Sequence, residues 1–173
     1  ALLAVMFLTD EDDCSVADPR FFAEDDPALG PFTSVRCFTQ GVTCDSADPL
    51  APGVHTGCVP RTDGLLHPIS RYADFWRQHK DPARRVLSVI AGPASGTVTL
   101  VADPQGDPEV ETSCTQQTGT AIPAIRMHAF VEAVQAPVSS WGFASVCGDL
   151  YQAPLQALGQ HLVARLHGQV CSP

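Results

Sequence analysis

The chain has 173 residues, of which 10 are lysine or arginine and 19 are aspartate or glutamate, so its formal net charge is −9. This acidity argues against nucleic-acid binding, because neutralising phosphates requires a basic face. Hydrophobic residues make up 45% of the chain and charged residues 17%, which excludes disorder over the whole length. Most of the excess acid lies in residues 1–63.

The first eight residues, ALLAVMFL, are uninterruptedly apolar. They are too few to cross a bilayer, and no other run reaches membrane length, so we expect no transmembrane segment. The basic start and the small-residue cleavage site of a signal peptide are absent. A continuously apolar run is typical of a strand buried on both faces of a sheet, with a neighbour on each side. We therefore expect the chain to be the C-terminal part of a domain whose N-terminal strands are missing here.

Residues 10–66 have the composition of a long acidic insertion. They are rich in Asp, Pro, Gly, Ser and Thr and show no sustained period, although we expect a short strand near Thr33–Phe38. A loop of this length is uncommon inside a compact domain. Four cysteines can cross-link this loop through disulfides, which makes a long insertion physically reasonable here.

Helical patterns follow the insertion. Apolar residues recur at i, i+3, i+4 and i+7 in residues 67–80 and again after Pro123, a residue that suits a first helical turn. A last helix is expected from about 151 to 167. Four of its leucines are expected to face inward: Leu155, Leu158, Leu162 and Leu166.

Apolar runs at 86–91 and 141–147 predict two more buried strands, separated by a second insertion over 93–122 with a hairpin strand near 97–101. Strands and helices thus alternate along the chain. This order predicts an α/β fold with a Rossmann-like, doubly wound, mostly parallel sheet and helices on both of its faces.

The seven cysteines include no C-x-x-C pair, which favours disulfides in an oxidising compartment over a zinc site. The expected topology suggests three disulfides. Cys37–Cys44 would close a short loop within the insertion, Cys14–Cys58 would join the two ends of the insertion, and Cys114–Cys147 would lie near the carboxyl edge of the sheet. Cys171 is left over, and we expect it to pair with a cysteine outside this chain.

Binding sites in open α/β sheets lie beyond the carboxyl ends of the strands. Four consecutive carboxylates, Asp10–Asp13, follow the first predicted strand. Such oxygen ligands suit Mg²⁺, Ca²⁺ or Mn²⁺. The alternative is a solvated acidic turn whose aspartates cap backbone N–H groups. No nucleophile elbow, phosphate loop or H-E-x-x-H pair is present, and we predict no enzymatic activity.

The stretch LLAVMFLTDEDDCS at Leu2–Ser15 resembles the von Willebrand factor A-like (VWA-like) domains of bacterial secreted lipoproteins. The most specific part of the resemblance is FLTDEDDCS followed later by IAGP. Further matching stretches are Gly30–Cys37, Gly57–Cys58, Arg71–Phe75, Val89–Pro93, Phe130–Ala133 and Phe143–Cys147.

The resemblance implies a metal-ion-dependent adhesion site at the carboxyl edge of the sheet. Asp10 matches the aspartate that follows the family's fourth strand, and Glu11 replaces the glycine of the usual T-D-G. The family's D-x-S-x-S motif is absent, so we expect only a partial site, with Thr9, Asp10 and Asp12 as candidate ligands of a divalent cation. Capping or solvation is the alternative role for Asp12 and its neighbour Asp13.

The family likeness further implies a binding module of the adhesion type, secreted or held at the cell surface or in the periplasm as an outer-membrane lipoprotein. Its partners would be another protein and the remainder of the same VWA-like domain. The alternative is a structural component of a cell-surface complex with a degenerate metal site, which the departure from T-D-G favours.

Overall fold

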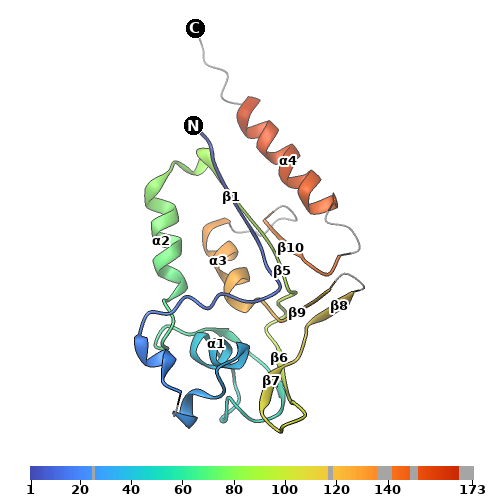
Figure 1. Ribbon diagram of the computed structural model, residues 1–173. Helices are drawn as coiled ribbons and strands as arrows, with labels where there is room; N and C mark the ends of the chain where they lie inside the picture. The colour runs from blue at the N-terminus through green and yellow to red at the C-terminus, as the bar shows by residue number, and fades with distance from the viewer. Residues whose placement is uncertain (25, 117–118, 136–141, 149–151, 168–173) are drawn as a thin grey trace.

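The computed structural model describes the chain except for residues 25, 117–118, 136–141, 149–151 and 168–173 (Figure 1). At its centre is a parallel sheet in the order β1–β5–β10, made of β1 (Leu3–Leu8), β5 (Arg85–Ala91) and β10 (Phe143–Ser145). The predicted α/β class, with parallel strands in this chain order, is confirmed.

Three helices follow the strands, as the periodicity predicts: α2 (Ile69–His79), α3 (Ile125–Gln135) and α4 (Gln152–His167). The helices α2 and α3 pack against each other and against one face of β5, in a cluster that includes Trp76, Val89 and Val131. A short 3-10 turn, Pro82–Arg84, links α2 to β5.

The expectation that all four leucines of α4 face inward is wrong for two of them. Leu155 is 43% exposed and Leu166 is 53% exposed. The helix α4 has 16 residues and packs against β5, and in Figure 1 it extends past the strands. A sheet of three strands, one of them only three residues long, offers too little surface to cover such a helix.

The strand β1 is not buried on both faces, contrary to the prediction from its apolar sequence. Among the described residues it lies at the edge of the sheet and pairs with β5 alone, in a parallel register that places Leu3 opposite Arg85. Its last three side chains are exposed: 48% for Met6, 40% for Phe7 and 59% for Leu8. An interior-type sequence therefore occupies an edge position in the described chain.

The predicted strand near Thr33–Phe38 is also wrong, because this segment forms the helix α1 (Ser34–Gly41). The Thr33 side chain accepts a hydrogen bond from the Val35 N–H (3.3 Å), an N-cap that favours a helix start. The remaining elements of this insertion are short: 3-10 turns at Pro19–Phe22 and Pro27–Leu29, β2 (Val42–Thr43), β3 (Gly53–His55) and β4 (Val59–Pro60).

The second insertion contains the predicted hairpin strand, β6 (Val98–Ala102), together with β7 (Pro108–Val110), β8 (Cys114–Gln116) and β9 (Gly119–Ala121). The strand β6 pairs with β7 and also with β3 of the first insertion. Buried residues from α1, β6 and β7 form a second apolar cluster. The two insertions therefore fold together as one unit at one end of the parallel sheet (Figure 1).

Three disulfides are present in the described part of the chain, and only one has the expected pairing. The expected Cys114–Cys147 bond is confirmed. The other two are Cys14–Cys37 and Cys44–Cys58, so the predicted Cys37–Cys44 and Cys14–Cys58 pairings are wrong. Antiparallel pairing of β2 with β4 brings Cys44 beside Cys58, which a sequence without visible strands could not indicate. Cys171 lies outside the described residues.

Candidate functional site

The carboxyl end of β1 is held in place by backbone hydrogen bonds. The Thr9 N–H donates to the Ile90 carbonyl (3.0 Å), which keeps Thr9 in register with β5. The next carbonyl, that of Asp10, accepts a hydrogen bond from the Ile122 N–H (3.0 Å). Asp10 is thereby fixed between the end of β1 and the segment that leads into α3.

A cavity of about 250 Å³ opens at this edge of the sheet, lined by Leu8, Thr9, Asp10, Gly119, Thr120, Val146 and Cys147. The Asp10 side chain is exposed, and its carboxylate has no hydrogen-bond or ion-pair partner among the described residues. Thr120 was missed by the sequence reasoning. The signal for it was the Cys114–Cys147 disulfide, which ties the β8–β9 hairpin to the segment after β10.

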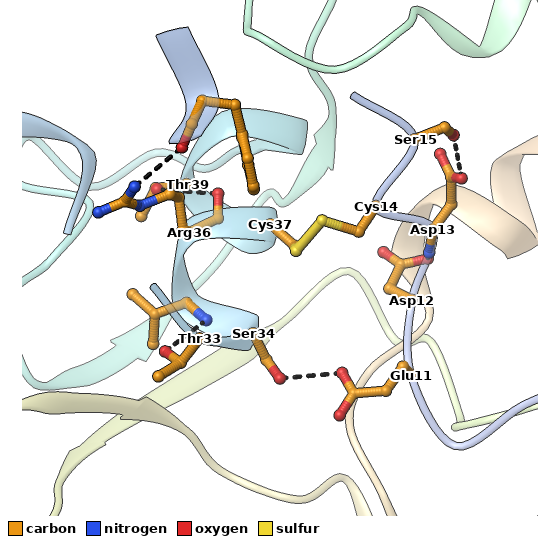
Figure 2. Close-up of a disulfide and its surroundings, with 12 residues drawn as sticks. Glu11, Asp12, Asp13, Cys14, Ser15, Thr33, Ser34, Arg36, Cys37 and Thr39 are labelled. Atoms are coloured by element: carbon orange, nitrogen blue, oxygen red, sulfur yellow. Dashed lines mark hydrogen bonds between the residues drawn. A yellow bond between two sulfur atoms is a disulfide. The ribbon is translucent and has the colours of Figure 1, made fainter. Parts of the chain in front are cut away.

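Thr9 and Glu11 are engaged locally. The Thr9 hydroxyl donates to the Glu11 carbonyl (3.0 Å) and accepts from the Glu11 N–H (3.1 Å), closing a tight turn. The Glu11 carboxylate points toward α1 and accepts a hydrogen bond from the Ser34 hydroxyl (2.9 Å), as Figure 2 shows. Of these two side chains, only that of Thr9 belongs to the residues around the cavity of Asp10.

Asp12 caps α3. Its carboxylate accepts hydrogen bonds from the N–H groups of Arg126 (3.0 Å) and Met127 (3.0 Å), and also from that of Asp13 (2.9 Å). A helix N-terminus favours a negative charge there. Burial nevertheless raises the pKa of Asp12 to about 6, against the lowering effect of these hydrogen bonds. The capping alternative for Asp12 therefore has a geometric basis.

Asp13 forms an ion pair with Arg126 (2.8 Å) and accepts a hydrogen bond from the Ser15 hydroxyl (Figure 2). Arg126 is 1% exposed, and its guanidinium also donates to the carbonyls of Gly41 (2.9 Å) and His67 (2.6 Å). The acidic run thus divides by function. Asp12 and Asp13 contact α3 and the insertion, whereas Asp10 belongs to the lining of the cavity.

Within the described ranges, no three histidine, cysteine, aspartate or glutamate side chains converge on a point where a metal ion could bind. The residues that line the cavity include Asp10, Thr9 and Thr120, and of these the Thr9 hydroxyl is also hydrogen-bonded to the Glu11 backbone. Oxygen atoms are the ligands that Mg²⁺, Ca²⁺ and Mn²⁺ prefer, but these ions take about six or more of them. Oxygen donors suit such an ion, but the lining holds fewer of them than the ion takes.

No family model, no curated protein and no solved structure matches this chain. In addition, no helix of the described part is both long enough and apolar enough to cross a membrane. The three disulfides are compatible with a secreted protein, because such bonds persist in oxidising compartments.

Proposed function

We propose that the chain is the C-terminal part of a VWA-like domain that acts as a binding module of the adhesion type, with a divalent-cation site at the carboxyl edge of its sheet. The observation that carries the proposal is the Asp10 carboxylate. It belongs to a residue held by the backbone at the end of a parallel strand, in the lining of a cavity of about 250 Å³, and it has no protein partner among the described residues.

The chemistry of this edge suits Mg²⁺, Ca²⁺ or Mn²⁺. Asp10 supplies the anionic oxygen, and the Thr9 and Thr120 hydroxyls supply neutral ones. The remaining ligands come from the rest of the VWA-like domain and from an acidic residue of a protein partner. A cation shared in this way makes partner binding depend on the metal without any chemical turnover.

The disulfides also support a location of the module outside the cytosol. Disulfides in the insertion and at the candidate site need an oxidising environment. We propose that the protein is secreted or held at the cell surface, as the resemblance to bacterial lipoproteins implies, and that the outer membrane or periplasm is its location.

Isothermal titration of the protein with Mg²⁺, Ca²⁺ and Mn²⁺ tests the cation site. We expect at least one of these ions to bind, and Asp10→Asn to weaken binding at least tenfold, because it removes the charged ligand while keeping the shape. The matched control is Asp103→Asn, an acid on the β6–β7 turn, which should leave the affinity unchanged. Absence of binding to all three ions, or equal affinities for wild type and Asp10→Asn, would remove the cation from the proposal.

A second candidate is a structural component of a cell-surface complex, with a degenerate site. It is favoured by the local engagement of Thr9 and Glu11 and by the capping role of Asp12, which leave Asp10 as the one acid of the run that faces the cavity. A pull-down in the presence of the chelator EDTA distinguishes the two candidate functions. A protein complex that survives EDTA supports the structural role, and a complex that dissociates supports the cation-dependent role.

A further inference from the structure

Two phenylalanine rings are exposed next to each other on the first insertion. Phe22 is 55% exposed and Phe32 is 59% exposed, although their ring centroids lie only 5.9 Å apart. One exposed apolar side chain needs no explanation, whereas exposed apolar side chains that adjoin one another can mark an interaction site. The rings of Phe22 and Phe32 are called the aromatic pair below.

Buried groups hold the aromatic pair in place. The Phe21 ring, which is 4% exposed, has its centroid 5.4 Å from that of Phe22 and 6.0 Å from that of Phe32. The Arg36 guanidinium lies 5.0 Å from the centre of the Phe32 ring and donates to the carbonyls of Phe21 (2.8 Å) and Gly30 (2.6 Å). Arg36 thereby joins the two segments that carry the exposed rings. Rings fixed in this way lose little conformational freedom on binding, which suits them as anchors of an interface.

An acidic cavity of about 480 Å³ adjoins the segment that carries Phe32. Pro31 and Thr33, the chain neighbours of Phe32, belong to its lining. The lining holds no basic residue, and it includes four acidic ones: Glu11, Asp103, Asp107 and Glu109. None of these four forms an ion pair with a described basic side chain. The cavity therefore presents unbalanced negative charge beside the aromatic pair.

The residues that follow Phe22 have the same sign of charge. Glu24 and Asp26 are exposed, and neither forms an ion pair with a described basic side chain. Arg20, the nearest base in the sequence, already pairs with Asp18 (2.7 Å). Carboxylates attract cations, and so do the faces of aromatic rings. The surroundings of both rings therefore favour a ligand that combines apolar groups with positive charge.

We infer that the aromatic pair and the acidic cavity form a docking surface for a basic segment of another protein. Apolar side chains of that segment pack on Phe22 and Phe32, and one of its arginine or lysine side chains enters the acidic cavity. A second copy is disfavoured as occupant, since each copy has a net charge of −9. Anionic lipid is disfavoured for the same reason, because the carboxylates beside the rings repel it.

This surface goes beyond the proposed cation site. Of the residues that line the cavity of Asp10, only Thr120 also lines the acidic cavity. Cation binding does not involve Phe22, so Phe22→Ser should leave the affinity for the metal ions unchanged. Failure of either proposal is therefore distinguishable from failure of the other.

Fluorescence anisotropy of the full-length protein with two labelled probe peptides tests the inference. One peptide alternates arginine with leucine, and the other alternates glutamate with leucine at the same length. We expect the arginine–leucine peptide to bind at least about tenfold more tightly, because its charge complements the surface. Absence of binding by this peptide, or equal affinities for the two peptides, would overturn the inference.

Two variants with matched controls locate the binding. Phe22→Ser should weaken binding of the arginine–leucine peptide by about tenfold, whereas Val54→Ser, at a valine of the same insertion that is 68% exposed, should not. If Phe22→Ser does not fold, Glu109→Gln in the acidic cavity tests the same surface. It should weaken binding by about threefold, and Glu132→Gln on α3 is its control.

Equal effects of a variant and its control would show that the peptide binds through net charge alone, and would contradict the docking surface. Sedimentation with phosphatidylglycerol vesicles separates a protein partner from a membrane. We expect the protein to stay in the supernatant. Sedimentation that Phe22→Ser abolishes would instead assign the aromatic pair to a lipid surface and overturn the inference.

Discussion

The parallel-sheet region and the insertion at residues 10–66 are stabilised by different interactions. Around β5, buried apolar side chains such as Val89 and Val131 pack against one another, and hydrophobic burial accounts for their positions. In the insertion, a buried cation organises the chain. Arg36 is 1% exposed and donates hydrogen bonds to the carbonyls of Phe21 (2.8 Å) and Gly30 (2.6 Å).

The difference teaches how buried arginines add to apolar packing in an acidic, turn-rich segment, whose Val35 and Phe38 also belong to the second apolar cluster. Arg36 donates to the buried Phe21 carbonyl, and Arg126 donates to the Gly41 carbonyl and also neutralises Asp13. Two disulfides then restrict the unfolded chain. The sheet region tolerates apolar exchanges of equal volume, whereas the insertion depends on a few particular polar contacts.

The largest expected effect is therefore at Arg126. Arg126→Met leaves Asp13 without its ion-pair partner and removes the donors to Gly41 and His67, at a cost of about 3–5 kcal/mol in the free energy of unfolding. Urea denaturation measures this loss in the free energy of unfolding. Arg77→Met is the control, since Arg77 pairs with Asp74 at the surface and should change stability by no more than about 1 kcal/mol. Similar losses in the two variants would show that Arg126 has no special role.

The next effect concerns the disulfide between Cys14 and Cys37. Replacing both residues with serine opens a loop of 23 residues and should cost about 3 kcal/mol. The loss should be local: exchange protection should fall in α1, which contains Cys37, and persist in β5. Unchanged protection in α1 would mean that Arg36 and apolar packing alone hold the insertion.

A pH dependence at Asp12 is the third and smallest effect. Its pKa is raised to about 6 in the folded protein, so the folded state binds this proton more tightly than the unfolded state does. The resulting stabilisation is fully present below about pH 4 and is lost as pH rises through about 6, by about 2–3 kcal/mol. Asp12→Asn keeps an acceptor oxygen for the N–H groups of Arg126 and Met127 and should flatten this part of the stability profile.

The control for Asp12 is Asp18. Its pKa is lowered by the hydrogen bonds and the charge of Arg20, so its contribution has the opposite sign and is lost as pH falls. Chemical denaturation of the wild type, Asp12→Asn and Asp18→Asn between pH 4 and 7.5 distinguishes the contributions of Asp12 and Asp18 to the free energy of unfolding. A wild-type profile that Asp12→Asn leaves unchanged would contradict the raised pKa of Asp12.

The same division explains how much could be predicted from the sequence. The helix over 69–79 and the strand over 85–91 follow from periodicity within a short window. The exposure of β1 could not be predicted, because an apolar run indicates what a strand prefers and not which neighbours it has. The insertion's disulfide pairs depend on long-range contacts, such as the approach of β2 to β4, that no local pattern contains.

At the candidate site, the position of Asp10 at a strand end was predictable from the apolar run before it. Thr120 was not, since its place beside Asp10 depends on a hairpin carried by the Cys114–Cys147 bond. The four successive carboxylates looked equivalent in sequence. Only the approach of α3, whose first N–H groups engage Asp12, assigns them different roles.

Paramagnetic broadening by Mn²⁺ tests the proposed cation site most directly, because it reports where the ion binds. At substoichiometric Mn²⁺, we predict that the amide signals of Asp10, Thr120 and Val146 broaden first, and that Asp10→Asn abolishes this effect. Broadening centred on the acidic β6–β7 turn near Asp103 and Asp107, with the signals around Asp10 unaffected, would contradict a cation site at the carboxyl edge of the sheet.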